Sequence, residues 1–248
     1  TCGLAAASGY LSILLWARQN GFMWDNRTWL AAAAGVHLDI LLWAKQNGCP
    51  RDQKTCAQAR KGGYLTVLQW ARQNGGCPWD EESCTYAAKG AYLTVLKWAR
   101  QNECPWDGRT CSLVALHGRL KPLQWARQAG CPWDERTCAA AAAGGHLAVL
   151  QWARRNGCPW DSRTCSAAAS KGHLVLQWWA RQNGCAWDAT TCSSAAAGGH
   201  VSLLRRARGN GCPWDHATCT SAAKEGHLAV LEWAREEGCP WNKPRCLR

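Results

Sequence analysis

Hydrophobic positions in this chain recur in a short cycle, which residues 137–163 show most clearly. Consecutive alanines at 139–143 favour helix and leave little side-chain bulk, so neighbouring helices can approach closely. Gly144-Gly145 is typical of a helix end. A broad apolar helical face then follows, formed by Leu147, Val149, Leu150, Trp152 and Ala153. The remaining stripe carries Ala148, Gln151 and Arg155. The pattern predicts two helices per cycle, the second covered on both sides.

The ends of these helices also have sequence signals. Thr137 is of a type preferred at helix N-caps, so we expect it to cap the first helix. The second helix is expected to begin near His146 and to close at Asn156-Gly157. Residues 158–161, Cys-Pro-Trp-Asp, form a tight connector in which Asp161 can accept hydrogen bonds from nearby backbone amides.

The cycle repeats along the whole chain with a period of about 27 residues. A Trp followed by Ala and Arg or Lys stands at Trp16, Trp43, Trp70, Trp98, Trp125, Trp152, Trp179 and Trp233, with Arg206 in the eighth place. Units start at Thr1, Thr28, Thr55, Ser83, Thr110, Thr137, Thr164, Thr191 and Thr218, and residues 245–248 begin a partial unit. Units of this length cannot bury a core alone, whereas stacked units bury their apolar helix surfaces between neighbours.

The pattern T-x-x-x-A-A-x-x-G-H-L-x-V-L, followed by a long second helix and N-G, resembles the ankyrin repeat over the whole chain. The resemblance implies an all-α, ankyrin-like helix-turn-helix solenoid of nine stacked repeats in one domain, residues 1–248. Leucine-rich repeats have a similar period, but their strand signature is missing from the sequence. Tetratricopeptide units are longer.

Departures from the ankyrin pattern change the expected binding surface. TPLH is replaced by Thr-Cys-Ala-Ala or similar residues, and the connector is reduced to Gly-Cys-Pro-Trp-Asp plus two residues. We therefore expect short connectors without extended β-hairpin fingers, which leaves the concave first-helix face for binding. Because Thr1 begins inside the pattern without an initiator Met, we expect the chain to be a fragment of a longer protein.

Composition narrows the class of protein and partner. The chain is 47% hydrophobic and 19% charged, which excludes a disordered or membrane class. Its apolar runs are far shorter than the roughly 18 residues that a membrane span needs, so no membrane span is expected. A net charge of +12 favours a protein partner with an acidic surface and leaves nucleic acid as the weaker alternative.

The chain has 17 cysteines at fixed repeat positions, as in Cys104 and Cys111, which stand seven apart. Structural zinc prefers gaps of about two to four residues and four ligands, so zinc is a minor alternative, as are disulfides within the connectors. Free cysteine behaves as a small buried hydrophobe. We expect buried, reduced thiols and an intracellular reducing compartment, with the cytoplasm favoured over the nucleus or an organelle interior.

The 18 tryptophans and a column of cations each allow two interpretations. The tryptophans suit core and inter-repeat packing, the favoured interpretation, or stacking of a carbohydrate, pigment or base. A cation two residues after each helical Trp position stands at Arg18, Lys45, Arg72, Arg100, Arg127, Arg154, Arg181, Arg208 and Arg235. These cations complement the helix dipole, with the connector aspartates within reach, or they bind an acidic partner.

The sequence shows no P-loop, G-x-S-x-G, H-E-x-x-H or dinucleotide motif. Most histidines stand at predicted helix starts, where they usually satisfy backbone groups. We therefore expect no enzyme activity, no catalytic residue, and no cofactor or metal site.

Variation between units points to a candidate binding site, because the constant positions build the stack. The first helices of units three to five depart most from alanine. Candidate partner-binding residues are Arg60, Lys61, Tyr86, Lys89, Leu113, Leu116 and His117. They predict a protein-interaction scaffold that binds through the concave first-helix face and could belong to a larger assembly; the alternative is a basic nucleic-acid-binding solenoid.

Overall fold

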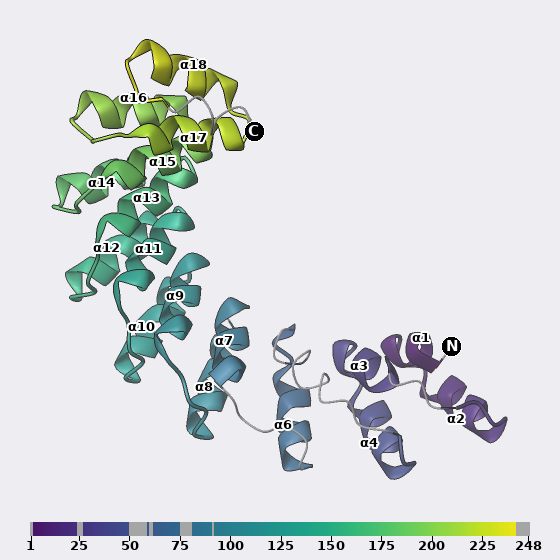
Figure 1. Cartoon of the computed structure of the whole chain (residues 1–248). Helices are drawn as coiled ribbons and strands as arrows, with labels where there is room; N and C mark the ends of the chain where they lie inside the picture. Colours follow the sequence, from purple (N-terminus) through teal and green to yellow (C-terminus); the bar gives the residue numbers. More distant parts are fainter. Residues whose placement is uncertain are drawn as a thin grey trace. The chain divides into compact units, whose positions relative to one another are not determined.

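The structure, a computed structural model, describes residues 2–23, 27–49, 59, 62–74, 81–90 and 92–241, without the side chains of 81–83 and 86. These residues form seventeen α-helices and no strand (Figure 1). The all-α prediction is confirmed for this part of the chain. None of its helices has the length and apolar character needed to span a membrane.

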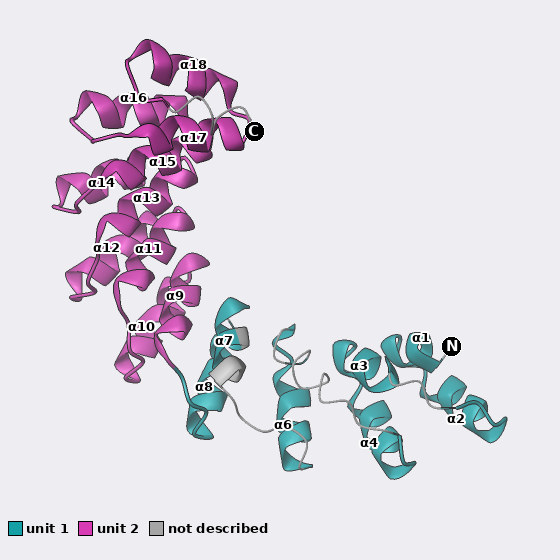
Figure 2. Cartoon of the chain, viewed as in Figure 1, with its two compact units in different colours: residues 1–106 teal, residues 107–248 magenta. Residues whose placement is uncertain are grey.

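The chain divides into two compact units, Thr1–Trp106 and Asp107–Arg248 (Figure 2). Where both helices are described, each unit shows helix pairs in which a first helix packs against the second helix that follows it. The prediction of one domain over residues 1–248 stays a prediction.

In the second unit, the first helices stack on one another in chain order. These first helices are α9 (Gly108–Leu116), α11 (Glu135–Ala143), α13 (Ser162–Ser170), α15 (Ala189–Ala197) and α17 (His216–Lys224). The second helices that follow them are α10 (Leu120–Gln128), α12 (Leu147–Arg155), α14 (Leu174–Gln182), α16 (Val201–Gly209) and α18 (Leu228–Glu236). Each second helix packs against the first helix of its own pair, so neighbours in sequence are neighbours in space.

The first unit has the same local arrangement. Its helices are α1 (Cys2–Ala7), α2 (Leu11–Gln19), α3 (Arg27–Ala34), α4 (Leu38–Gln46), α6 (Leu65–Gln73), α7 (Glu81–Lys89) and α8 (Leu93–Gln101). Helix α1 stacks on α3, and the pairs α1–α2, α3–α4 and α7–α8 pack together. Sequential stacking of this kind is consistent with a helical solenoid.

The expected N-cap of the first helix is wrong by three residues. Helix α11 begins at Glu135, and the side chain of Asp134 accepts a hydrogen bond from the Arg136 backbone amide at 3.0 Å. Thr137 lies inside the helix and is fully buried. Asp161 accepts the equivalent bond from Arg163, as predicted for the connector. The carboxylate is the better cap because it also complements the positive end of the helix dipole.

The other helix ends agree with the sequence analysis. Helix α12 runs from Leu147 to Arg155, with Asn156 as C-cap and Gly157 at a φ of +80°. Helix α11 ends at Ala143, with Gly144 as C-cap and Gly145 at a φ of +76°. A Cβ on Gly145 would lie only 2.6 Å from the His173 ring of the next pair, so this position needs glycine for both its conformation and its close packing.

Small residues rather than tryptophans form the centre of the stack. Alanine, leucine, valine and cysteine side chains supply almost all of the buried hydrophobic set, and every cysteine in the described residues is buried. Most tryptophans of the second unit are only half-buried, among them Trp133 and Trp152. Their rings meet edge to face across neighbouring pairs, with centroids 5.7 Å apart. The predicted inter-repeat packing of tryptophan is confirmed here, although the rings lie at the edge of the core.

Histidines before the second helices connect neighbouring pairs. His146 Nε2 lies 3.0 Å from the carbonyl oxygen of Leu116, and His173 and His227 make the same contact to Ala143 and Ala197. A carbonyl oxygen can only accept, so Nε2 carries the proton and donates. This satisfies a carbonyl at the end of the preceding first helix, which has no intrahelical donor. The predicted backbone role of these histidines is therefore confirmed.

Candidate functional site

The predicted partner-binding residues of the first unit are only partly covered by the structure. Arg60 and Lys61 lie outside the described residues, as does the side chain of Tyr86 on α7. Lys89 is the last residue of α7, and its side chain is exposed. This one cation is therefore placed on the surface at the C-terminal end of a first helix, as expected.

The predicted residues of the second unit come together on α9. Leu113 and Leu116 are half-buried and lie three positions apart, on the same side of the helix. His117 caps the end of α9 and is exposed. The opposite side of α9 carries Cys111 and Val114, both fully buried in the stack. The structure thus separates a packing side of the helix from an outward side.

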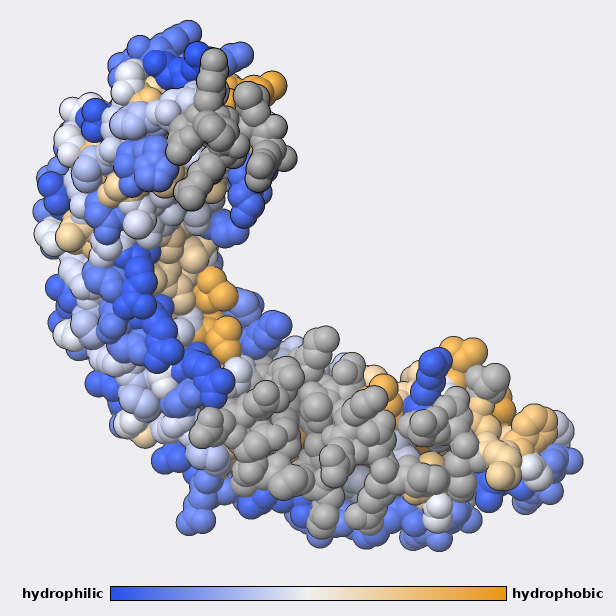
Figure 3. All heavy atoms as spheres, viewed as in Figure 1, coloured by the Kyte–Doolittle hydropathy of each residue, from blue (hydrophilic) through white to orange (hydrophobic). Residues whose placement is uncertain are grey.

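Equivalent outward positions on the next two first helices continue this surface. We call the set the first-helix strip, and it consists of Leu113, Leu116, Ala140, Ala143, Ala167 and Ser170. All six are half-buried, and their helices α9, α11 and α13 stack directly. Figure 3 shows apolar atoms gathered on this side of the second unit, next to hydrophilic side chains.

Sequence reasoning missed the alanine part of the first-helix strip. The alanines of α11 were assigned only to close helix approach, which Ala141 and Ala142 perform from fully buried positions. Ala140 and Ala143 occupy the same repeat positions as Leu113 and Leu116, so their partial exposure could have been inferred from the alignment of the units. Helical spacing of three and four residues carries that signal.

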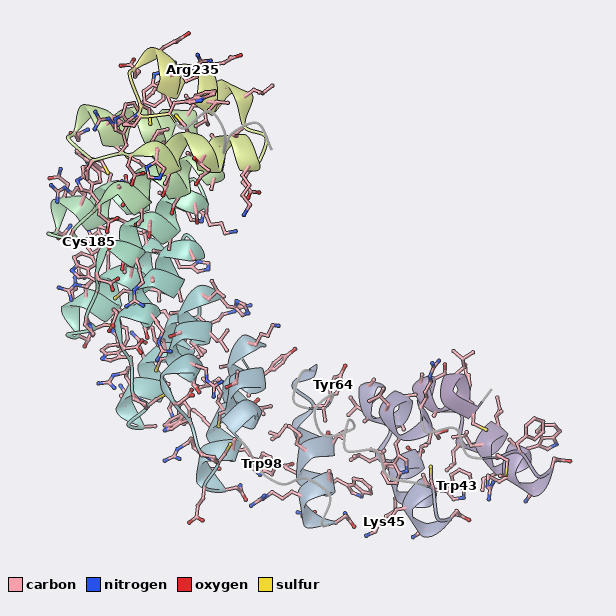
Figure 4. The ribbon with its side chains drawn as sticks, viewed as in Figure 1. Trp43, Lys45, Tyr64, Trp98, Cys185 and Arg235 are labelled. Atoms are coloured by element: carbon pink, nitrogen blue, oxygen red, sulfur yellow. The ribbon has the colours of Figure 1, made fainter. Side chains whose placement is uncertain are left out.

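In four of the described helix pairs, the cation of the column on the second helix makes two contacts. Arg127 Nη1 donates to the carbonyl oxygen of Cys131 at 2.6 Å, and the guanidinium lies 4.2 Å from the centre of the Trp133 ring. The same carbonyl bond and Trp stacking occur at Arg100, Arg154 and Arg208. Arg181 and Arg235 also lie over connector tryptophans; Figure 4 labels Arg235 on α18. We call this arrangement the arginine clamp.

The connector aspartates have a different partner from the one expected. Asp134 caps α11 and lies 2.6 Å from Nη2 of Arg136, two residues further along the chain. The hydrogen bond from Arg136 lowers the pKa of Asp134 below its ordinary value. Arg163 pairs with Asp161 and reaches back to Glu135 of the preceding pair at 3.0 Å. For these pairs, the expectation that the aspartates serve the arginine column is wrong.

Open recesses lie beside the arginine clamps. One of about 430 Å³ is lined by residues that include Arg127, Trp133 and Trp152. Arg208, Trp214, Trp233 and three neighbouring residues line its counterpart between the last two pairs, with a volume of about 360 Å³. Each recess combines aromatic ring edges with cationic and polar groups.

Comparison of the sequence with family models and with curated proteins finds no match. The functional argument therefore rests on the described surface itself.

Proposed function

We propose that this chain is a non-enzymatic, ankyrin-like solenoid of nine repeats that binds a protein partner through its first helices. The first-helix strip carries this proposal. Leu113 and Leu116 stand where the following pair has Ala140 and Ala143, so the stack itself requires no large side chain there. Apolar side chains gathered on one accessible surface, with polar residues beside them, mark protein interaction sites.

The charge near this surface favours an acidic protein. Lys171 and Lys224 are exposed at the C-terminal ends of α13 and α17, and Lys89 has the same setting in the first unit. Cations around apolar contacts would attract an acidic surface and exclude basic ones. We also propose an intracellular reducing compartment, since every described cysteine is a buried thiol.

Quantitative affinity purification from the source cells tests the proposal. The variant Leu113→Glu with Leu116→Glu should lose at least about tenfold of the captured partner, because it places two charges on the proposed contact. Val175→Glu with Leu228→Glu is the matched control, since both side chains are exposed, at 72% and 68%, on second helices. Equal loss in both variants, or in neither, would reject the first-helix strip as the binding site.

Nucleic acid is a second candidate because the two described recesses share an aromatic and cationic composition. Single-stranded nucleic acids stack bases on aromatic rings and pair phosphates with cations. The arginine clamp makes nucleic-acid binding the weaker candidate, because the guanidinium of Arg127 is already stacked on Trp133 and hydrogen-bonded within the protein. Titration with single-stranded and duplex nucleic acid across a salt series decides the matter: a steep fall of log affinity with log salt would favour this candidate.

A further inference from the structure

In the part of the chain that the structure describes, two buried cysteines meet inside each of six helix pairs. The first stands on the first helix and the second in the connector after the second helix, 20 residues later. The pairs are Cys84–Cys104, Cys111–Cys131, Cys138–Cys158, Cys165–Cys185, Cys192–Cys212 and Cys219–Cys239. The Sγ atoms of Cys84 and Cys104 lie 2.9 Å apart, and in the other five pairs the two side chains are within hydrogen-bonding reach.

This pairing differs from the one that the sequence suggests. The seven-residue spacing brings Cys131 and Cys138 close along the chain, but Cys131 faces Cys111 and Cys138 faces Cys158. A link at the observed pairing joins a first helix to its own connector. Disulfides within the connectors, considered from the spacing, would require both thiols to leave these partners.

In two of the pairs, Cys165–Cys185 and Cys192–Cys212, the two thiols are chemically unequal. In the pair on α13, the hydrogen bond between the thiols raises the pKa of Cys165 and lowers that of Cys185. The hydrogen bond from Cys212 likewise lowers the pKa of Cys192. Figure 4 labels Cys185 in the connector after α14. A thiol with a lowered pKa supplies the thiolate that oxidation requires.

We propose that these six thiol pairs are oxidation sites, each converted by a peroxide into a disulfide within one repeat. The thiolate attacks one peroxide oxygen, which breaks the O–O bond and leaves a sulfenic acid and a hydroxide; the hydroxide takes up the proton that the thiol had lost and becomes the first water. The partner thiol then attacks that sulfur, forms the Sγ–Sγ bond and releases a second water. Two thiols lose two electrons in total, and hydrogen peroxide gains them.

A metal would be the other use of paired thiols, but the geometry does not favour it. Among the described residues, no group of three or more histidine, cysteine, aspartate or glutamate side chains is placed to hold an ion. Structural zinc needs four ligands. Burial of the thiols does not prevent their oxidation. Each helix pair packs only against the neighbouring helix pairs, so it can open locally and admit a molecule as small as peroxide.

The first two repeats, which start at Thr1 and Thr28, provide internal controls. Cys2 and Cys49 are buried like the others, but neither has a cysteine at the paired position: Phe22 stands in the connector 20 residues after Cys2, and Trp29 stands on the first helix 20 residues before Cys49. The Trp29 indole nitrogen donates to the Cys49 carbonyl oxygen at 3.3 Å, so a ring fills part of this space. These two cysteines should remain thiols under conditions that oxidise the six pairs.

Peptide mapping of the full chain tests the proposal. The reduced protein is treated with hydrogen peroxide without denaturant, alkylated and digested with trypsin. Cleavage after Arg136, Arg154, Arg155 and Arg163 separates the two cysteines of one pair, so a disulfide joins peptide 137–154 to peptide 156–163. We expect this link and its five counterparts, with Cys2 and Cys49 alkylated. A link between Cys131 and Cys138 would overturn the proposal. So would full alkylation of the cysteines, with links formed only when urea is present during the peroxide treatment.

A pair of variants separates a specific link from general oxidation. Cys158→Ser should remove one cross-linked peptide, leave Cys138 alkylated, and reduce the peroxide-induced rise in melting temperature. Cys49→Ser should change neither the links nor the rise, and dithiothreitol should reverse the rise in both. Melting of the reduced variants confirms that each one folds. If Cys158→Ser keeps the full rise, or Cys138 finds another partner in the folded chain, the assigned pairing is wrong.

Discussion

Replacing Arg154 with Gln should destabilise the chain by about 2 kcal/mol, because this arginine makes three separate contributions. Its Nη1 donates to the Cys158 carbonyl oxygen at 2.5 Å, a bond from a charged donor that is typically worth about 1.5 kcal/mol or more. The guanidinium lies 4.3 Å from the Trp160 ring centre, which adds about 0.5 kcal/mol at a partly exposed site. The helix dipole contributes about 0.3 kcal/mol more.

Urea unfolding of the full chain, followed by circular dichroism, measures this cost. Arg155→Gln is the matched control, because Arg155 shares the last turn of α12 but is exposed, so its loss should remove only the dipole contribution. Arg154→Lys keeps the charge but not the planar guanidinium, so its loss of unfolding free energy should lie between those of Arg154→Gln and Arg155→Gln. If Arg154→Gln and Arg155→Gln cost the same, the arginine clamp does not stabilise the fold.

Four further predictions follow from the described contacts. Asp161→Ala should cost about 1 kcal/mol of unfolding free energy, because the N-cap hydrogen bond is lost. Thr164→Val should be neutral or stabilising, because the buried Thr164 hydroxyl makes no hydrogen bond in the described structure. Urea unfolding compares the two variants. His146→Ala should cost about 1 to 3 kcal/mol and weaken coupling between neighbouring pairs, seen as a broader unfolding transition. Trp152→Ala should cost less than the 3 to 5 kcal/mol typical of a fully buried aromatic, about 2 kcal/mol by urea unfolding, because the ring is half-buried. The hydrogen bond with Cys138 and burial raise the pKa of Cys158, so the folded state keeps this proton to a higher pH than the unfolded state does. The unfolding free energy of the reduced chain should therefore fall above about pH 8.5, the ordinary pKa of a thiol. Urea unfolding across a pH series measures it.

Much of the fold could be predicted because the repeats present the same local signals many times. The glycines after each helix and the apolar spacing fixed the helix pairs and most of their ends. The cap at Asp134 was missed because Thr137 is equally suitable by residue type, and only the position of the first turn decides between them. That position depends on how the connector enters the helix, which a single-sequence propensity does not contain.

Side-chain partners were harder to predict than the fold. The pairing of Cys131 with Cys111 depends on how a second helix folds back on a first helix, whereas the spacing along the chain pointed to Cys138. The carbonyl oxygen that holds Arg127 has no sequence signature, because every residue has one. On the candidate surface, Leu113 and Leu116 were found by their departure from alanine, while Ala140 and Ala143 gave no such contrast.

The contact from His146 to the Leu116 carbonyl has a consequence for how the chain folds and for how its length can change. It spans 30 residues, and the bond from Arg163 to Glu135 spans 28. Closing a loop of this size costs the same entropy wherever it occurs in the array, so folding can begin at any pair and spread to its neighbours. Adding or deleting a whole unit leaves these spans unchanged, and the relative contact order falls as units are added. Gene duplication within such a chain would therefore lengthen its surface without slowing the formation of any single contact.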